Sequence, residues 1–531
     1  MTRSTPDLRQ ASSAERLLRL HEELIRLNAY PPDEATLSTV RRALSRFRRR
    51  RDLARFRSRL RDTGLAGTVI GFPFFWPTAR WLVDRWPDRV QIDWDSYTGA
   101  DRLEAFLYLL MPFTESIALD DLVMTPEDWL DNFKNPAETD AAFLIRRVAA
   151  APVDDAWREK LYEDLGLPLI IDPAPGTPNR TEARYPGIPA SYQVEPLDRS
   201  RPDLPTEIAR PPRRITAVSR REGHSLIDMA RAAMVTRSRD LDVFVNADPV
   251  DVQLIEDGGG LWFAAMGLRV DKRHVLETVQ GFLILRSGVP LGYVLNTSLF
   301  NTSEVALNIF DTFRGGETGL IYGRVLAMLR LLYRSDVFVV PPYQLGHEND
   351  EGLASGAWWF YYKLGFRPID RGILRLVRRE LARLQRRPGY RSSLDTLNQL
   401  ASENMYWYLE GKRTDVFGRL VLGRVGLAVS NYLGDRFGAD RERAMTVCAD
   451  EAAGLLGVVE SLPGFSTGER LAWSRWAPVV LCLPGVDGWS AEERRALVAV
   501  IKAKGGKREI EYTRLFDEHV KLREAIVEMQ S

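Results

Sequence analysis

The spacing of hydrophobic residues changes several times along the chain, and these changes divide it into regions. In the first region apolar residues recur every three or four positions, as in the run that begins at Leu17, which predicts amphipathic helices. Ser12 to Glu15 precedes that run with the pattern of a helix capping box. We therefore expect a helical domain over residues 1–165.

Prolines mark the second region. Between Pro168 and Pro212 lie 11 of the 30 prolines of the chain. Because proline fixes φ and lacks a backbone N–H, this density disfavours long helices and central strands. We predict an extended, proline-rich connector over residues 166–215.

Short β-rich runs separated by turn residues characterise the third region, 216–385. Helical runs then alternate with a strand at Val337 to Pro341, which predicts a crossover helix packed on the sheet. Gly258 to Gly260 is interpreted as a hairpin turn. The region is therefore predicted to hold a mixed, mostly antiparallel sheet, with strands that include Leu261 to Met266, Gly281 to Arg286 and Leu291 to Leu295.

The last region, residues 386–531, returns to helical spacing, for example over 441–462 and 491–504. The predicted fold class is thus α/β: a mixed sheet with packed helices, flanked by N- and C-terminal helical domains. A chain of 531 residues is too long for one hydrophobic core, which agrees with this multidomain organisation.

Composition and cysteine usage narrow the functional classes. Only two cysteines are present, Cys448 and Cys482, and their separation suits neither a disulfide framework nor a metal site. The longest uncharged apolar run, Trp476 to Val486, is shorter than the roughly 20 residues that span a bilayer, and the amino terminus lacks the apolar core of a signal peptide. We expect a cytoplasmic protein without a metal cofactor and without a membrane partner.

The most informative run is Ser355 to Phe366, which predicts an aromatic-rich helix ended by Gly365 and followed by a strand. About forty residues upstream, Glu304 to Phe310 has the pattern of a strand, and Arg314 to Gly319 opens a second helix. A strand, a glycine turn and a helix N-terminus together form a place where backbone N–H groups can hold an anion.

These segments, with the hairpin that ends in Gly288 to Val294, resemble the GCN5-related N-acetyltransferase (GNAT) family over about a third of the chain. The resemblance implies a GNAT-like domain over residues 216–385 and acetyl-CoA or another acyl-CoA as co-substrate. It also implies direct transfer of the acyl group, in a ternary complex, to an amine on a small-molecule or protein acceptor.

The resemblance also implies the coenzyme-binding residues. Arg314, Gly315 and Gly319 match the loop that holds the pyrophosphate, whereas Glu317 stands where the family has glycine. That carboxylate either repels the diphosphate or serves the first turn of the helix. The remaining residues assigned to the coenzyme are Gly316, Thr318, Ser355, and Ile309 and Phe310, whose backbone would meet the acyl carbonyl.

Tyr361 matches the family tyrosine that protonates the departing thiolate, although an aromatic residue at helical spacing can also be a core residue. The attacking amine must lose a proton, so a base is required. Glu304, His347 and Glu351 are the candidates for this base.

Arginines are concentrated near the amino terminus, with 11 in the 21 residues from Arg41 to Arg61. The first 62 residues carry 16 basic and 8 acidic side chains, in a chain of net charge +1. Such a segment suits RNA, an acidic protein surface or coenzyme phosphates, or it is a solvated helix paired with acidic neighbours.

Two other functions stay open. The departures at Glu317 and at Ala354, where the family has an asparagine, would be explained by a GNAT-like module that has lost catalysis and serves in ligand sensing or as a scaffold. Alternatively, a transferase on the same fold would take its acyl group from an aminoacyl-tRNA, with Arg41 to Arg61 as the RNA contact. Fold analogy by itself does not choose between these functions.

Overall fold

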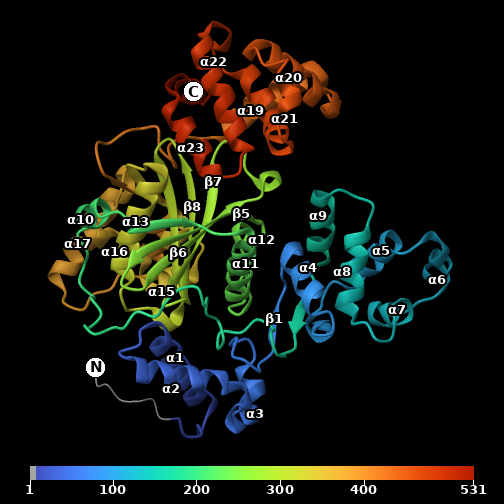
Figure 1. Cartoon of the computed structure of the whole chain (residues 1–531), viewed down its shortest axis with the longest axis vertical. Coiled ribbons are helices and arrows are strands. Elements are labelled where there is room, and N and C mark those ends of the chain that lie inside the picture. Colours follow the sequence, from blue (N-terminus) through green and yellow to red (C-terminus); the bar gives the residue numbers. More distant parts are fainter. Residues whose placement is uncertain (1–7, 531) are drawn as a thin grey trace. The chain divides into compact units, whose positions relative to one another are not determined.

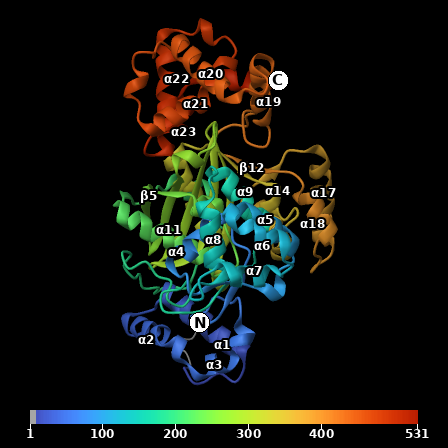
Figure 2. The same ribbon diagram turned by 90° about the vertical axis from the view of Figure 1, so that its right-hand side faces the viewer.

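The computed structural model describes residues 8–530, which form two compact units (Figures 1 and 2). Unit 1 contains residues 8–195 together with His224–Asn246 and Arg286–Pro290. Unit 2 contains Pro196–Gly223, Ala247–Leu285 and residues 291–530. Residues 1–7, from which we expect no signal peptide, lie outside the described part of the chain.

Unit 1 is mostly helical, and its helices between residues 76 and 165 pack around a small antiparallel sheet of order β1-β3-β2. Its strands are β1 (Ile70–Phe72), β2 (Val90–Ile92) and β3 (Leu169–Ile171). Its helices are α1 (Ala14–Ala29), α2 (Glu34–Ser45), α3 (Arg51–Phe56), α4 (Trp76–Arg85), α5 (Ala100–Leu110), α6 (Ser116–Asp121), α7 (Pro126–Phe133), α8 (Asp140–Ala150), α9 (Asp155–Leu165) and α12 (Asp242–Val245), with most of α11 (Arg220–Val235).

The proline-rich stretch contributes regular structure, contrary to the sequence-based expectation. Strand β3 is the central strand of the unit 1 sheet, so the expectation that this stretch holds no central strand is wrong. Pro168 stands directly before the strand, where its missing N–H removes no ladder bond. The same stretch also forms helix α10 (Leu204–Ala209) in unit 2.

The amino-terminal segment differs in detail from the predicted pattern. Helix α1 is capped by Ser13, whose hydroxyl accepts a hydrogen bond from the Arg16 N–H (3.3 Å), and not by Ser12. The arginine-rich segment is not one helix. It comprises the end of α2, the 3₁₀ turn Phe47–Arg49, α3 and the 3₁₀ turn Arg57–Leu60.

Unit 2 is built on a nine-stranded mixed sheet of order β11-β12-β10-β9-β8-β7-β6-β5-β4. Strands β9 and β10 pair in parallel, whereas β8 with β9 and β10 with β12 pair antiparallel. The sheet extends to Tyr408, beyond the boundary expected at residue 385. Its strands are β4 (Arg214–Ala217), β5 (Ala247–Gly258), β6 (Leu261–Leu268), β7 (Thr278–Arg286), β8 (Val289–Leu299), β9 (Thr302–Ile309), β10 (Val337–Val340), β11 (Arg367–Pro368) and β12 (Met405–Tyr408).

Helix α13 (Thr318–Tyr333) makes the crossover from β9 to β10 and packs on α16 (Ala357–Leu364), beside it in Figure 1. Gly365 ends α16 with φ of 108°, as the sequence predicted. Gly258 to Gly260 all have positive φ and turn the chain from β5 to β6, also as predicted. The other helices of the unit are α14 (Pro342–Leu345), α15 (Asp350–Ser355), α17 (Arg371–Arg386), α18 (Leu394–Ala401), α19 (Gly423–Phe437), α20 (Arg441–Leu456), α21 (Thr467–Cys482), α22 (Ala491–Lys504), α23 (Glu509–Glu518) and α24 (Val520–Glu528).

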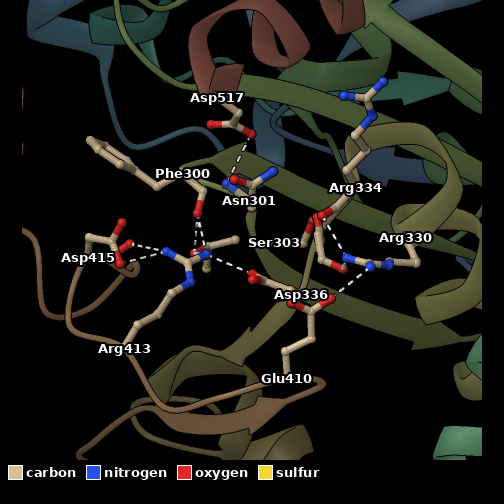
Figure 3. Close-up of polar contacts among 12 residues, drawn as sticks. Phe300, Asn301, Ser303, Arg330, Arg334, Asp336, Glu410, Arg413, Asp415 and Asp517 are labelled. Atoms are coloured by element: carbon tan, nitrogen blue, oxygen red, sulfur yellow. Dashed lines mark hydrogen bonds and ion pairs between the residues drawn. The ribbon is translucent and has the colours of Figure 1, made fainter. Parts of the chain in front are cut away.

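The C-terminal helices α19 to α24 pack against the end of the sheet where β8 turns into β9 (Figure 1). At this turn Phe300 and Asn301 have φ of 55° and 52°, a conformation that is costly for residues other than glycine. Figure 3 shows how it is held: the Asn301 N–H donates to Asp517 Oδ2 (2.9 Å), and Arg413 donates to the Phe300 carbonyl and to Asp336 Oδ1 (2.8 Å). The helical bundle thus fixes the beginning of β9.

The buried carboxyl at this turn should make stability depend on pH. Burial raises the pKa of Asp517 from 3.8 to about 7, against the hydrogen bond from Asn301. The folded protein therefore holds this proton to a higher pH than the unfolded chain does. The resulting contribution to the free energy of unfolding is fully present below about pH 4 and is lost as the pH rises through about 7. Between pH 5 and 8 the free energy of unfolding of the wild type should fall, relative to Asp517→Asn, by on the order of 2 kcal/mol.

Urea denaturation at pH 5, 6, 7 and 8 measures this difference, with Asp450→Asn, an exposed carboxyl of the same bundle, as the control. Parallel pH profiles for the wild type and Asp517→Asn would contradict the prediction.

Candidate functional site

The candidate site lies where β9 and β10 separate. The two strands pair only from Thr302 to Glu304, after which β10 ends and β9 continues to Ile309. A cavity of about 620 Å³ opens at the gap. Its walls come from β9, the loop before α13, helices α14 to α16 and a segment before α10, and consist of Arg199, Ser200, Arg201, Pro202, Leu307, Asn308, Ile309, Arg314, Gly315, Gly316, Thr318, Gly319, Gln344, Asn349, Glu351, Gly352, Ser355, Ala357, Phe360, Tyr361, Lys363 and Leu364.

Side chains replace a neighbouring strand along the free half of β9. The Phe310 N–H points toward β8, where it donates to the Leu291 carbonyl (2.9 Å), so strand alternation turns the polar groups of Leu307 and Ile309 toward the gap. The Leu307 carbonyl accepts from Gln344 Nε2 (2.7 Å), and the Ile309 carbonyl accepts from Arg314 Nε (3.1 Å). The gap is therefore lined by backbone groups that a bound molecule can reach.

The structure brings Ile309 into the cavity but not Phe310. The Phe310 ring is buried beside Tyr293 (ring centroids 6.2 Å apart), and its N–H is already bonded to Leu291. The expectation for the Phe310 backbone is therefore wrong, and that for Ile309 stays a prediction, because alternate N–H groups of a strand point to opposite sides.

The glycine loop reaches the cavity through Gly315, Gly316, Thr318 and Gly319. Gly315 has φ of 75°, which explains why glycine stands there. Glu317 is the N-cap residue of α13, is 8% exposed, and is not among the lining residues. Its side chain makes no capping hydrogen bond, so the carboxylate neither lines the cavity nor caps the helix through a side-chain hydrogen bond.

Arg314 is engaged by acidic side chains. Its guanidinium forms ion pairs with Asp311 (Nη1 to Oδ1, 2.7 Å) and with Glu351, besides its bond to the Ile309 carbonyl. Glu351, a candidate base, thus lies at the cavity as the partner of the arginine expected to hold phosphate. An incoming anion would have to compete with Glu351 for Arg314.

Tyr361 lines the cavity and is 2% exposed. Its hydroxyl accepts a hydrogen bond from Gln344 Nε2 (2.9 Å), and its ring packs edge-to-face on Tyr322 (centroids 5.3 Å apart). Burial raises the pKa of Tyr361 above its ordinary value of 10, against the hydrogen bond from Gln344. The phenol therefore stays protonated at every physiological pH and can donate a hydrogen bond into the cavity.

Of the other predicted residues, Ser355 lines the cavity, whereas Glu304 and His347 do not. Glu304 lies in the paired half of β9, and burial raises its pKa. His347 Nδ1 lies 3.1 Å from Asn398 Oδ1, in a contact with α18. The structure therefore gathers Tyr361 and Glu351 at one cavity and leaves Glu304 and His347 outside it.

The segment Arg199–Pro202, part of the predicted connector, lines the cavity without having been predicted as part of a site. Two glycines of α13 let this segment and α10 approach closely: a Cβ at Gly319 would lie 3.1 Å from Pro202 Cδ, and one at Gly323 would lie 3.0 Å from Glu207 Cβ. The segment is thus packed against the helix whose N-terminus borders the cavity.

Arg324 of α13 binds the chain that follows this segment. It is 1% exposed, pairs with Asp257 (2.7 Å), and donates to the carbonyls of Glu207 (2.6 Å) and Arg210 (2.7 Å). A buried guanidinium with all these bonds is costly to disturb. Helix α10 is therefore held on α13, which fixes the position of the residues that precede it.

Positive charge dominates the cavity rim. The rim exposes Arg199, Arg201 and Lys363, and Arg314 lies beside them. Glu351 is the acidic residue of the cavity lining. Within residues 8–530, no ion pair or side-chain hydrogen bond engages Arg199 or Arg201. Two arginines beside a proline carry no sequence signal for a site, since the same composition is common in linkers.

Comparison with protein families, curated proteins and solved structures finds no match to this chain. In the described part of the chain, no group of three or more His, Cys, Asp or Glu side chains is arranged to hold a metal ion. No helix among residues 8–530 is long and apolar enough to cross a bilayer.

Proposed function

We propose that unit 2 is a GNAT-like, acyl-CoA-dependent N-acyltransferase that transfers an acyl group, such as acetyl, to an amine. One observation carries the proposal. The parallel strands β9 and β10 separate beside a glycine loop at a helix N-terminus, and Tyr361 lines the same cavity. This arrangement supports binding of an extended, phosphate-bearing thioester, because strand-edge amides and a helix N-terminus are available together.

The free half of β9 suits the pantetheine arm of the coenzyme. Gln344 bridges the Leu307 carbonyl and the Tyr361 hydroxyl with its side-chain amide. An amide of the arm, lying along β9 like an added strand, would take over the bond to Leu307. The Ile309 N–H, which faces the gap, would then donate to the thioester carbonyl as negative charge develops on its oxygen.

The reaction would proceed by direct attack. A neutral acceptor amine forms the new C–N bond, the C–S bond breaks, the thiolate leaves as a hydrogen-bond acceptor of Tyr361, and the ammonium proton passes to water or to a nearby carboxylate. Because burial raises the pKa of Tyr361, its role is stabilisation of the thiolate by a hydrogen bond more than full transfer of its own proton.

The phosphates would lie at the basic rim. Arg314 is paired with Asp311 and Glu351, whereas Arg199 and Arg201 make no such pairs with described residues. These two arginines, with Lys363 and the glycine loop, are therefore the principal phosphate ligands in our proposal. Binding of acyl-CoA without transfer to any amine would instead favour the ligand-sensing alternative.

Replacing the two rim arginines tests the coenzyme site. In calorimetric titrations, Arg199→Ala with Arg201→Ala should weaken binding of acetyl-CoA at least tenfold but leave S-acetylpantetheine, which lacks the phosphates, unchanged. The matched control is Arg220→Ala with Arg221→Ala, two exposed arginines outside the cavity lining. If the wild type binds neither compound, the proposed function is wrong.

Tyr361→Phe should lower kcat at least tenfold, because the leaving thiolate loses its hydrogen-bond donor. Thermal unfolding should change little, since the lost bond to Gln344 contributes about 1 kcal/mol. Tyr362→Phe, a neighbouring tyrosine outside the cavity lining, serves as the control in the acetyl transfer assay. Unchanged turnover for Tyr361→Phe would remove the role assigned to this phenol.

Glu351→Gln should tighten acetyl-CoA binding several-fold, because it releases Arg314 from a competing carboxylate. If Glu351 instead accepts the amine proton, the same change lowers kcat and leaves the Kd of the coenzyme unaltered. Titration and steady-state kinetics on this variant distinguish the two roles.

A further inference from the structure

Helix α17 has one face made almost entirely of arginine. At 100° per residue, its six arginines fall within an arc of about 140°, and its apolar residues fall on the other side of the helix. The arginines are Arg371, Arg375, Arg378, Arg379, Arg383 and Arg386. The apolar residues are Ile373, Leu374, Leu376, Val377, Leu381 and Leu384.

The only carboxylate of α17 points inward. Glu380 is fully buried, and it accepts hydrogen bonds from Arg383 (2.6 Å), Ser392 (2.6 Å) and Tyr390 (3.0 Å). Val377, on the same side of the helix, is 3% exposed. This carboxylate therefore neutralises little of the outer face.

Four of the outer arginines lack such partners. All six are exposed, and in the described part of the chain no ion pair engages Arg371, Arg378, Arg379 or Arg386. Residues 371–391 carry eight arginines and one glutamate. Figures 1 and 2 both show α17 at the outer edge of unit 2, away from the terminal bundle. The face is accessible and its positive charge is not balanced by the protein.

We propose that the arginine face of α17 binds the sugar–phosphate backbone of a nucleic acid. The face extends about 22 Å from Arg371 to Arg386, which is roughly two-thirds of a turn of duplex. A duplex presents about one phosphate charge per 1.7 Å, so several arginines can contact phosphates at once. Guanidinium groups bind phosphate through two parallel hydrogen bonds, which favours arginine over lysine here.

Two other partners fit this face less well. A membrane-surface helix needs an apolar side to insert, but Leu376 and Val377 of α17 are buried and, of its six apolar residues, only Leu384 is exposed. Protein interfaces are centred on aromatic or other apolar anchors, whereas the residues that fall within the arginine arc here are Gly372 and Ala382. The arginine face of α17 offers positive charge without apolar anchors, which suits the regularly spaced phosphates of a nucleic acid.

The arginine-rich segment 41–61 of unit 1 is a weaker candidate. Its arginines are spread over several short helical segments, so they form no regular row. Two of them are neutralised, since Arg50 pairs with Asp52 and Arg61 pairs with Asp93, both at 2.7 Å. Helix α17 is therefore the surface to which we assign the nucleic acid.

Fluorescence anisotropy with the full chain tests this assignment. The probes are labelled RNA and DNA duplexes of about 24 base pairs, roughly two turns, and a single-stranded RNA of about 24 nucleotides. Binding of each probe is measured between about 50 and 200 mM NaCl. A change of Arg371, Arg375, Arg379 and Arg386 to Gln should weaken binding of at least one probe roughly 100-fold. It should also make the slope of log Kd against log salt smaller by about 3. The same four positions changed to Lys should keep that slope within about one unit.

The control variant removes four positive charges elsewhere on unit 2, at Arg441, Arg443, Arg495 and Lys521, and should change Kd less than about threefold. Because glutamine is a good helix former, circular dichroism should show an intact fold in each variant. The assignment is overturned if the wild type binds none of the probes, or binds only anionic vesicles. It is also overturned if Arg46, Arg49, Arg55 and Arg59 changed to Gln abolish binding while the α17 variant does not.

Discussion

The unpaired half of β9 is the constraint on which the site in unit 2 depends. A buried backbone N–H or carbonyl must find a hydrogen-bond partner, and β10 supplies partners only as far as Glu304. Beyond that point the partners are the side chains of Gln344 and Arg314. Side-chain partners can be exchanged for a ligand, whereas a paired strand cannot, so the early end of β10 creates a binding edge inside a continuous sheet.

Both ends of β9 are held so that this edge stays open. At its beginning, Asp517 and Arg413 hold a turn that the chain would not adopt readily without them. At its far end, the Phe310 N–H bonds to β8 and the glycine loop leads directly into α13. The C-terminal helical bundle therefore contributes to the site indirectly, by fixing the strand that forms its wall.

Arginine has three different roles in unit 2, and its surroundings decide which one applies. Arg324 is buried and saturated with acceptors, so it fastens α10 to α13. Arg314 forms ion pairs with carboxylates at the cavity, so its charge is partly neutralised before any anion binds. Arg199, Arg201 and four arginines on the outer face of α17 are exposed without such partners among residues 8–530, which leaves them to ligands from outside the chain.

The sequence by itself determined the local structure wherever a local rule was sufficient. Apolar spacing and Gly365 specify α16, the glycines 258–260 specify a hairpin, and Gly315 specifies a left-handed turn before α13. These features depend on neighbouring residues, whose interactions a sequence pattern records directly. Tyr361, Ile309 and the glycine loop, by contrast, were candidate site residues only because these segments resemble the GNAT family.

Only the tertiary structure decided the rest, because the deciding contacts join residues far apart in the chain. Arg199 and Arg201 reach the cavity because Gly319 and Gly323 admit the segment that carries them, and Gln344 is placed by the end of β10. Glu351 becomes the partner of Arg314 across 37 positions of sequence. The spacing of residues along a chain does not specify such long-range contacts. They are determined by how the sheet and its helices pack together.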